Sequence, residues 1–173
     1  AGLSHRYLRG TEYSAAGVEG VDLVLERGRS LAVIGTTGSG KSTLLKHLNA
    51  VLLPTEGTVE LFGMDTRDPR VDLRIIRKTA ALAVQHPEAA LFEPFVADDV
   101  AYGPRNAGVK GAALRDAVRR ALGSVGLPYD VYADRYIRSL SGGEKRRVAL
   151  AGVLALEAPL TALDEPTAAL DGS

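Results

Sequence analysis

The sequence has no cysteine, no tryptophan and no excess charge of either sign. Its 173 residues include 21 Lys and Arg, which are matched by 21 Asp and Glu. The absence of cysteine excludes disulfides, thiolate metal sites and cysteine nucleophiles, although it does not fix the redox compartment. Because the net charge is zero, no long-range field favours nucleic acid or an anionic membrane surface. We therefore expect no nucleic-acid partner, and any affinity for an anion must be local.

Long hydrophobic runs are also missing. The longest apolar stretch, 148–163, is interrupted by Glu157 and Pro159, so no segment is predicted to span a bilayer. Apolar residues nonetheless make up 46% of the chain, which is enough for the core of one domain of ordinary size. The composition therefore predicts a single globular domain.

One glycine-rich stretch organises the rest of the chain. It joins a short apolar run at 31–34 to a predicted helix, and it consists of Gly35, Thr36, Thr37, Gly38, Ser39, Gly40, Lys41 and Ser42. Between a strand and a helix, successive amides of such a loop point at a phosphate, with the positive end of the helix dipole behind them. We interpret the stretch as a nucleotide phosphate cradle, in which Lys41 reaches the β and γ phosphates and Ser42 the magnesium. The alternative is a glycine-rich turn that happens to precede a lysine.

The spacing of apolar residues predicts an α/β core with a helical insertion. Strands are predicted over 21–26, 30–35, 57–63, 79–84 and 160–163, the first with one wet face and the second buried on both faces. Helices are predicted over 41–49, 72–78, 96–106, 112–125 and 142–156. Since helical periodicity replaces the strand pattern between Pro87 and Leu140, we expect the insertion to lie there.

Two carboxylates follow the last predicted strand. Asp164 and Glu165 stand where the apolar run 160–163 ends, and open α/β sheets bind ligands at the carboxyl ends of their strands. The pattern resembles a Walker B element, in which Asp164 holds magnesium through its water shell and Glu165 orients or deprotonates the water that attacks the γ phosphate. A solvated acidic turn before Pro166 is the alternative.

A serine and two glycines open the helix predicted from 142. Ser141 and Glu144 have the spacing of a capping box, in which each side chain bonds the backbone amide of the other residue. A capping box does not require Gly142 and Gly143, each of which costs about 1 kcal/mol inside a helix. The glycines favour a second interpretation, the close approach of another, anionic molecule to the helix start. The two interpretations are compatible.

Taken together, these motifs resemble the ATPase subunit of an ABC transporter, and their order and spacing match that family across nearly the whole chain. The matching motifs are the phosphate loop, Gln85, Leu-Ser-Gly-Gly-Glu at 140–144, Leu-Asp-Glu-Pro at 163–166 and Ala-Leu-Asp at 169–171. The resemblance implies an α/β fold: a P-loop NTPase (RecA-like) core with a small antiparallel β part and a helical insertion subdomain. The core would comprise 1–85 and 146–173, and the helical subdomain about 86–145, of a single, incomplete nucleotide-binding domain.

The resemblance also implies ligands and site residues. Two subunits would enclose two ATP molecules with Mg²⁺, and each ATP would be bound by the phosphate loop of one subunit and the signature segment of the other. Catalysis would fall to Glu165, Gln85 and Lys41, and magnesium binding to Ser42, Gln85 and Asp164. The ATP contacts would be Gly35, Thr36, Thr37, Gly38, Ser39, Gly40, Lys41, Ser42, Thr43, Tyr7, Ser141, Gly142, Gly143, Glu144 and Asp171.

Tyr7 is included because it stands where the family has an aromatic residue that stacks on adenine. Tyr13 is a rival for this role. A lone tyrosine is also explained by ordinary packing.

Within the family, segments 85–92 and 98–104 resemble the energy-coupling-factor importers for cobalt, nickel and vitamins. This implies an ATP-hydrolysing subunit that works at the cytoplasmic face of the cell membrane with a second ATPase subunit, identical or not. Membrane subunits would dock on the helical subdomain near Leu91 and Phe92, unless these residues cover the insertion's own core. The alternatives are a non-transport ABC ATPase of DNA repair or translation, and another P-loop enzyme such as a kinase.

One departure from the family pattern concerns the switch histidine. The family places it on a strand beyond the D-loop, which corresponds to 169–171, but His5, His47 and His86 all precede Asp164. We therefore expect the chain to be truncated after the D-loop.

Overall fold

The computed structural model describes residues 1–166. It divides into two compact units, Ala1–Ala80 and Ala81–Ser173. No helix of the described residues is long and apolar enough to cross a lipid bilayer. The proposed division into a core (1–85 and 146–173) and a helical subdomain (86–145) stays a prediction.

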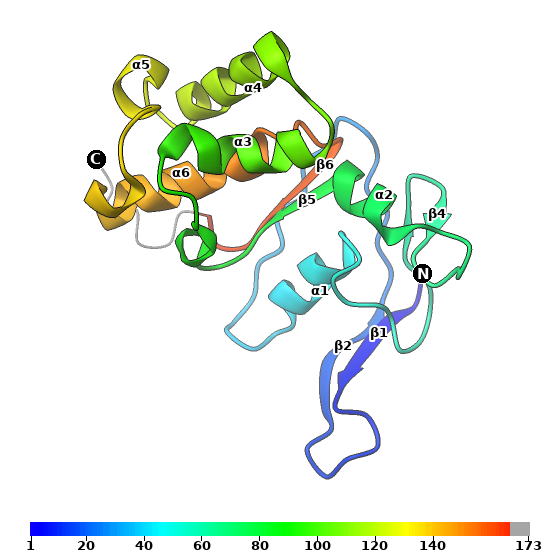
Figure 1. Ribbon diagram of the computed structural model, residues 1–173. Helices are drawn as coiled ribbons and strands as arrows, with labels where there is room; N and C mark the ends of the chain where they lie inside the picture. Colours follow the sequence, from blue (N-terminus) through cyan, green and yellow to red (C-terminus); the bar gives the residue numbers. More distant parts are fainter. Residues whose placement is uncertain (167–173) are drawn as a thin grey trace. The chain divides into compact units, whose positions relative to one another are not determined.

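The first unit contains two small sheets and two short helices, which Figure 1 shows in blue to green. Its elements are β1 (Leu3–Tyr7), β2 (Ala15–Val21), α1 (Lys41–His47), β3 (Glu60–Leu61), β4 (Met64–Asp65) and α2 (Leu73–Thr79). β1 pairs antiparallel with β2, and β3 with β4. The helices predicted after the phosphate loop and over 72–78 are confirmed as α1 and α2. Asp72 caps the start of α2, because its side chain accepts a hydrogen bond from the Arg74 amide.

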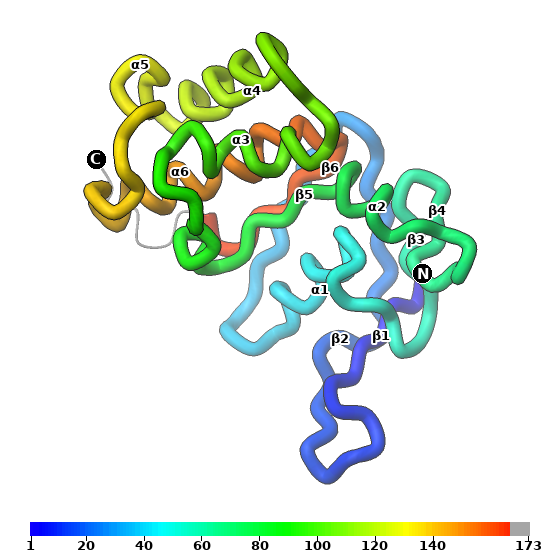
Figure 2. The backbone as a smooth tube through the Cα atoms, viewed as in Figure 1, coloured from blue at the N-terminus to red at the C-terminus, as the bar shows by residue number. Residues whose placement is uncertain are grey.

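Two of the predicted strands are wrong. Residues 22–35 form an irregular segment between β2 and α1 (Figure 2), so only Val21 of the strands predicted over 21–26 and 30–35 lies in a strand. Val24 is 88% exposed and Ile34 is 92% exposed. An apolar run becomes a strand when a neighbouring strand takes its backbone hydrogen bonds, and no strand of the described residues pairs with this segment. The strand predicted over 57–63 is likewise reduced to the two residues of β3.

The second unit is mainly helical. Its elements are β5 (Ala80–Ala83), which starts at the boundary, the 3₁₀ helix η1 (Pro87–Ala90), α3 (Val96–Asn106), α4 (Gly111–Ser124), α5 (Tyr129–Tyr132), the 3₁₀ helix η2 (Ile137–Ser139), α6 (Gly142–Leu154) and β6 (Leu160–Leu163). β5 and β6 pair as a two-stranded sheet. The helices predicted over 96–106, 112–125 and 142–156 are confirmed as α3, α4 and α6, and the strand over 160–163 as β6.

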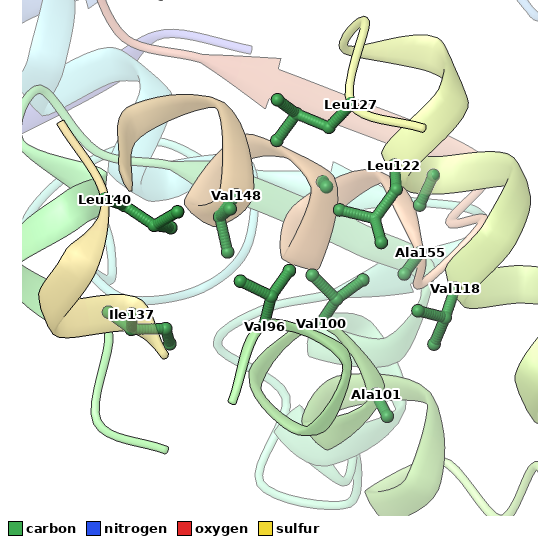
Figure 3. Close-up of a cluster of buried hydrophobic side chains, with 12 residues drawn as sticks. Val96, Val100, Ala101, Val118, Leu122, Leu127, Ile137, Leu140, Val148 and Ala155 are labelled. Atoms are coloured by element: carbon green, nitrogen blue, oxygen red, sulfur yellow. The ribbon is translucent and has the colours of Figure 1, made fainter. Parts of the chain in front are cut away.

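The core of the second unit lies between α3, α4 and α6. Val96 and Val100 of α3, Leu122 of α4 and Val148 of α6 are fully buried, and their side chains gather in one cluster (Figure 3). Val96 and Val100 stand four residues apart and so share one face of α3. Burying each such side chain contributes roughly 1.5–3 kcal/mol. This packing holds α6 in place, and the first three residues of α6, 142–144, belong to the predicted signature.

Candidate functional site

The phosphate loop predicted at 35–42 leads directly into α1. Gly38 has φ +83° and Gly40 has φ +90°, a backbone conformation that residues with a side chain rarely adopt. A Cβ at Gly38 would meet no atom within 4 Å in the described structure, whereas a Cβ at Gly40 would collide with the carbonyl of Gly17. Gly38 therefore leaves space for a ligand, and Gly40 is required by packing against β2.

Lys41 folds back over the loop that precedes it. Its Nζ donates to the carbonyl oxygens of Gly35 at 2.9 Å and Thr36 at 2.8 Å. The N-cap residue of α1, Gly40, provides no side-chain cap, and the first amides of a helix have no acceptor within the helix. The start of α1 thus combines a cation with uncapped amide donors, which fits a phosphate group. Ser42 lies at this same helix end.

Tyr7 lies against α1. Its hydroxyl is hydrogen-bonded to Thr43 Oγ1 at 3.0 Å, and its ring packs edge-on against His5, with centroids 4.7 Å apart. These contacts provide a packing role for Tyr7, although 36% of the residue remains exposed. The rival Tyr13 is 80% exposed. Stacking of Tyr7 on adenine stays a prediction.

The ends of β5 and β6 bring Gln85 and two carboxylates together. The Asp164 amide donates to the Ala83 carbonyl at 2.9 Å, which places the two strand ends side by side. There, Gln85 Nε2 donates to Glu165 Oε2 at 3.0 Å, and Asp164 is buried. Gln85 and Glu165 are 80 residues apart in the chain, so only the pairing of the strands makes them neighbours.

Sequence reasoning missed Arg146, a buried residue of α6. Its Nη2 donates to the Glu165 carbonyl at 2.6 Å, and its Nε lies 3.4 Å from the Pro166 carbonyl. The available signal was helical spacing, because Arg146 stands three residues before the buried Ala149 and shares its face of α6. Arg146 therefore supports the backbone that carries the predicted catalytic carboxylate.

Ser141 caps the start of α6. Its Oγ accepts from the Glu144 amide at 3.2 Å, and Glu144 Oε2 accepts from the Ser141 amide at 2.8 Å, so the predicted capping box is confirmed. A Cβ at Gly142 or Gly143 would meet no atom within 4 Å among the residues described. No contact within this part of the chain therefore requires glycine there, which favours the approach of another molecule.

Among residues 1–166, the hydrogen-bond partners of the Glu144 side chain all belong to its own unit. Besides the Ser141 bond, its Oε1 accepts from the Tyr132 hydroxyl at 2.8 Å and from Arg135 Nη1 at 3.2 Å. The Ser141 amide, followed by the Tyr132 hydroxyl, lowers the pKa of Glu144 to about 2. Glu144 thus anchors the helix start, and its predicted contact with ATP stays a prediction. Tyr132 and Arg135 were not identified from the sequence, where no motif marks them.

The predicted magnesium ligands are Ser42, Gln85 and Asp164. Residues 1–166 contain no cluster of three or more His, Asp or Glu side chains placed to hold a metal. Magnesium in nucleotide sites is held by one or two protein ligands together with phosphates and water. The binding of magnesium by Ser42, Gln85 and Asp164 therefore stays a prediction. Asp171, predicted to contact ATP, lies outside the described residues.

A family model described as ABC transporter matches residues 18–168. The chain belongs to the ABC transporter family. The predicted P-loop NTPase fold is confirmed by solved ABC cassettes. One is the structure of cbiO1 from Clostridium perfringens, described as part of the ABC transporter complex cbiONQ. It matches with a TM-score of 0.81 and 33% sequence identity, and the match covers 98% of this chain and 65% of the cbiO1 chain. Another is the dimeric ATP-binding cassette MJ0796 bound to ADP and Pi. It matches with a TM-score of 0.83 and 28% sequence identity, and the match covers 99% of this chain and 75% of the MJ0796 chain.

Relatives by sequence within the ABC family include energy-coupling factor transporter ATP-binding proteins. EcfA2 of Clostridium perfringens is 43% identical over 169 residues, which are 98% of this chain and 59% of the relative. A putative ABC transporter ATP-binding protein of Gloeobacter violaceus is 47% identical over 98% of this chain and 67% of its own length. This chain therefore spans about 59% of the length of the EcfA2 relative that it matches.

Proposed function

We propose that this protein is the ATP-binding and ATP-hydrolysing subunit of an ABC importer of the energy-coupling-factor class. The hydrogen bond between Gln85 and Glu165 carries the proposal, because it joins the two residues predicted to handle the attacking water at the ends of β5 and β6. The buried Asp164 directly precedes Glu165 in the sequence. Membership of the ABC family and the 43% identity to EcfA2 support the assignment.

The phosphate loop and the carboxylate edge would hold ATP and Mg²⁺. Backbone amides of the loop over 35–43 would bind the phosphates, and Tyr7 would stack on the adenine. Ser42, Gln85 and Asp164 would hold Mg²⁺, which when bound neutralises charge on the phosphate oxygens. Lys41 would exchange its bonds to the Gly35 and Thr36 carbonyls for bonds to phosphate. This exchange is favourable because a bond between two ionised groups is stronger than a bond to a neutral carbonyl.

Glu165 would act as the general base. A carboxylate that accepts a proton from water must be held within hydrogen-bond reach of it. Gln85 donates its amide N–H to Glu165 Oε2, which leaves Oε1 for the water and fixes the direction of the carboxylate. The pair therefore orients the water without consuming the whole carboxylate.

The signature at the start of α6 would bind the ATP held by a second subunit. The space above Gly142 and Gly143 allows close approach, and the capping box holds Ser141 in place. The related cassette MJ0796 is dimeric in its solved structure. We propose that two ATPase subunits, identical or not, close around two ATP molecules.

The helical part of the second unit would dock membrane subunits at the cytoplasmic face of the membrane. Phe92 is 62% exposed and stacks edge-on against Tyr102, with centroids 4.7 Å apart. Asp99 Oδ2 holds this turn by accepting from the amides of Phe92 and Glu93 at 2.9 and 3.0 Å. Leu91 instead packs partly buried against the core. Phe92 is therefore the better candidate for docking, and Co²⁺, Ni²⁺ or a vitamin is the proposed cargo.

Substitution Glu165→Gln in the complete gene product tests the ATPase assignment. Loss of the base should lower turnover by about 10²–10⁴-fold and leave ATP affinity unchanged, as measured by phosphate release and by titration with a fluorescent ATP analogue. Glu12→Gln, an exposed change in the β1–β2 hairpin, is the control. Normal turnover in Glu165→Gln would remove Glu165 from the mechanism, and a wild-type protein without ATPase activity would refute the proposed function.

Substitution Phe92→Asp tests the docking surface. A charge in place of an apolar anchor should abolish assembly, because a few buried aromatic residues dominate most interfaces, while ATP binding stays intact. Co-purification with the membrane subunits from detergent extracts measures the effect. Phe62→Asp provides a matched control, since Phe62 is 54% exposed in the first unit. Equal assembly of the two variants would exclude Phe92 as an anchor.

A further inference from the structure

We infer that Arg146 is a positioning residue for Glu165, acting on it from the signature helix α6. The inference rests on the proposed function, in which Glu165 is the general base. The inference adds Arg146 to the residues on which hydrolysis depends. Arg146 would act without contacting ATP, through the backbone of Glu165.

The guanidinium of Arg146 is buried and directed at main-chain oxygens. Arg146 is 3% exposed, and burial of a cation is unfavourable unless hydrogen bonds compensate for the lost water. Within residues 1–166 its acceptors are two consecutive carbonyls, those of Glu165 at 2.6 Å and Pro166 at 3.4 Å. The first distance is short and the second is at the limit of a hydrogen bond. The Glu165 carbonyl is therefore the principal partner of the charge.

The backbone of Glu165 needs such support. Its φ is +48°, in the left-handed region that non-glycine residues adopt only when their surroundings impose it. Pro166 adds a constraint, because the residue before a proline is disfavoured in the right-handed helical region. A donor on the Glu165 carbonyl fixes the peptide plane that follows its Cα and so holds the left-handed conformation.

This conformation determines where the carboxylate lies. With its backbone held by Arg146, Glu165 reaches Gln85, whose Nε2 donates to Oε2 at 3.0 Å. Without the arginine, the peptide plane is free to rotate and the carboxylate loses its fixed direction. Displacement of a catalytic group by about 1 Å can lower a rate on the order of 100-fold, so turnover should be sensitive to Arg146 and ATP binding should not.

The same helix carries the capped signature serine. Ser141 is the N-cap of α6, and Arg146 stands five residues later, a rise of about 7.5 Å along the helix. One short rigid segment thus holds both Ser141 and the support of Glu165.

Substitutions Arg146→Met and Arg146→Lys in the complete gene product test the inference. Met keeps the length of the side chain without donors, and should lower kcat about 10- to 100-fold with KM changed by less than about twofold. Lys keeps the charge but lacks the planar fork that reaches two carbonyls, and should give an intermediate kcat. Arg115→Met makes the same chemical change at an exposed position of α4 and should leave kcat unchanged.

A double-mutant cycle separates positioning from a merely structural role. If Arg146 acts through Glu165, Arg146→Met should cause no further loss of turnover in the Glu165→Gln background, because the two losses share one cause. Full additive loss, or a wild-type kcat in Arg146→Met, would overturn the inference. If Arg146→Met fails to fold, Arg146→Lys decides. A wild-type kcat in Arg146→Lys overturns the inference. A kcat that Arg146→Lys lowers in the wild-type background but not in the Glu165→Gln background supports it. Failure of the proposed function gives a different result, since Glu165→Gln alone would then have no effect.

Discussion

The first turns of α1 and α6 use opposite means to offer backbone amides to an anion. At α1 the N-cap is Gly40, which has no side chain to cap the helix, and Lys41 lies across the loop on the carbonyls of Gly35 and Thr36. At α6 the N-cap is Ser141, whose hydroxyl is joined to Glu144 in a complete capping box. One helix start lacks a side-chain cap, and the other supplies its own.

The difference shows that the start of α1 gains hydrogen bonds from an anion, whereas the start of α6 is already hydrogen-bonded without one. A loop whose lysine bonds its own neutral carbonyls gains when phosphate replaces them, so the α1 end should bind ATP by itself. The α6 end is already satisfied by Ser141 and Glu144, and a ligand adds to it only by close approach over Gly142 and Gly143. This arrangement suits a preformed surface that meets a nucleotide held elsewhere.

The largest expected effect comes from removing the cation at the α1 end. Lys41→Ala should abolish turnover and weaken ATP binding about 10- to 100-fold, the value of a charge-assisted hydrogen bond. Titration with a fluorescent ATP analogue measures the affinity. Lys46→Ala, in the last turn of the same helix, should bind ATP as the wild type does. Unchanged affinity in Lys41→Ala would remove the contrast between the two helix ends.

The next effect separates the two loop glycines. Gly38→Ala and Gly40→Ala both place a side chain at positive φ, which costs about 1–2 kcal/mol. Only Gly40→Ala also meets the Gly17 carbonyl, and overpacking adds typically 1–3 kcal/mol. Denaturation in urea should therefore show Gly40→Ala as the less stable variant. Equal stability would show that the contact between a Cβ at position 40 and the Gly17 carbonyl costs nothing measurable.

The smallest expected effect is the pH dependence of the α6 cap. The folded state lowers the pKa of Glu144 from 4.5 to about 2, so between these values the unfolded state binds more protons and stability rises with pH. The contribution of Glu144 is complete above about pH 4.5 and is lost as the pH falls toward 2. The thermal midpoint of the wild type should thus fall more steeply on acidification than that of Glu144→Gln.

The other carboxylates contribute equally to the pH dependence of the wild type and of Glu144→Gln, so their effects cancel when the two curves are compared. Asp68, whose pKa is lowered by its hydrogen bond to the Arg70 side chain, is present in both proteins. Parallel pH curves for the wild type and Glu144→Gln would show that the capping box contributes nothing measurable at the α6 end.

The sequence was sufficient where structure depends on residues close together in the chain. The helix bonds of α3 and the capping box join residues three or four positions apart, so periodicity predicted α3 without error and spacing predicted the Ser141–Glu144 pair. The order and spacing of the short motifs, from the phosphate loop to Ala-Leu-Asp at 169–171, likewise predicted the family that the family model confirms.

Only the tertiary structure decided which distant residues meet. The strand predicted over 30–35 has the right residues but pairs with no strand in the described part of the chain, since a strand needs a partner that its own sequence does not specify. The bond of Gln85 to Glu165 depends on β5 lying beside β6, and that of Arg146 to the Glu165 carbonyl on how α6 packs. Residues 80 positions apart become neighbours through the path of the whole chain, which local propensity does not encode.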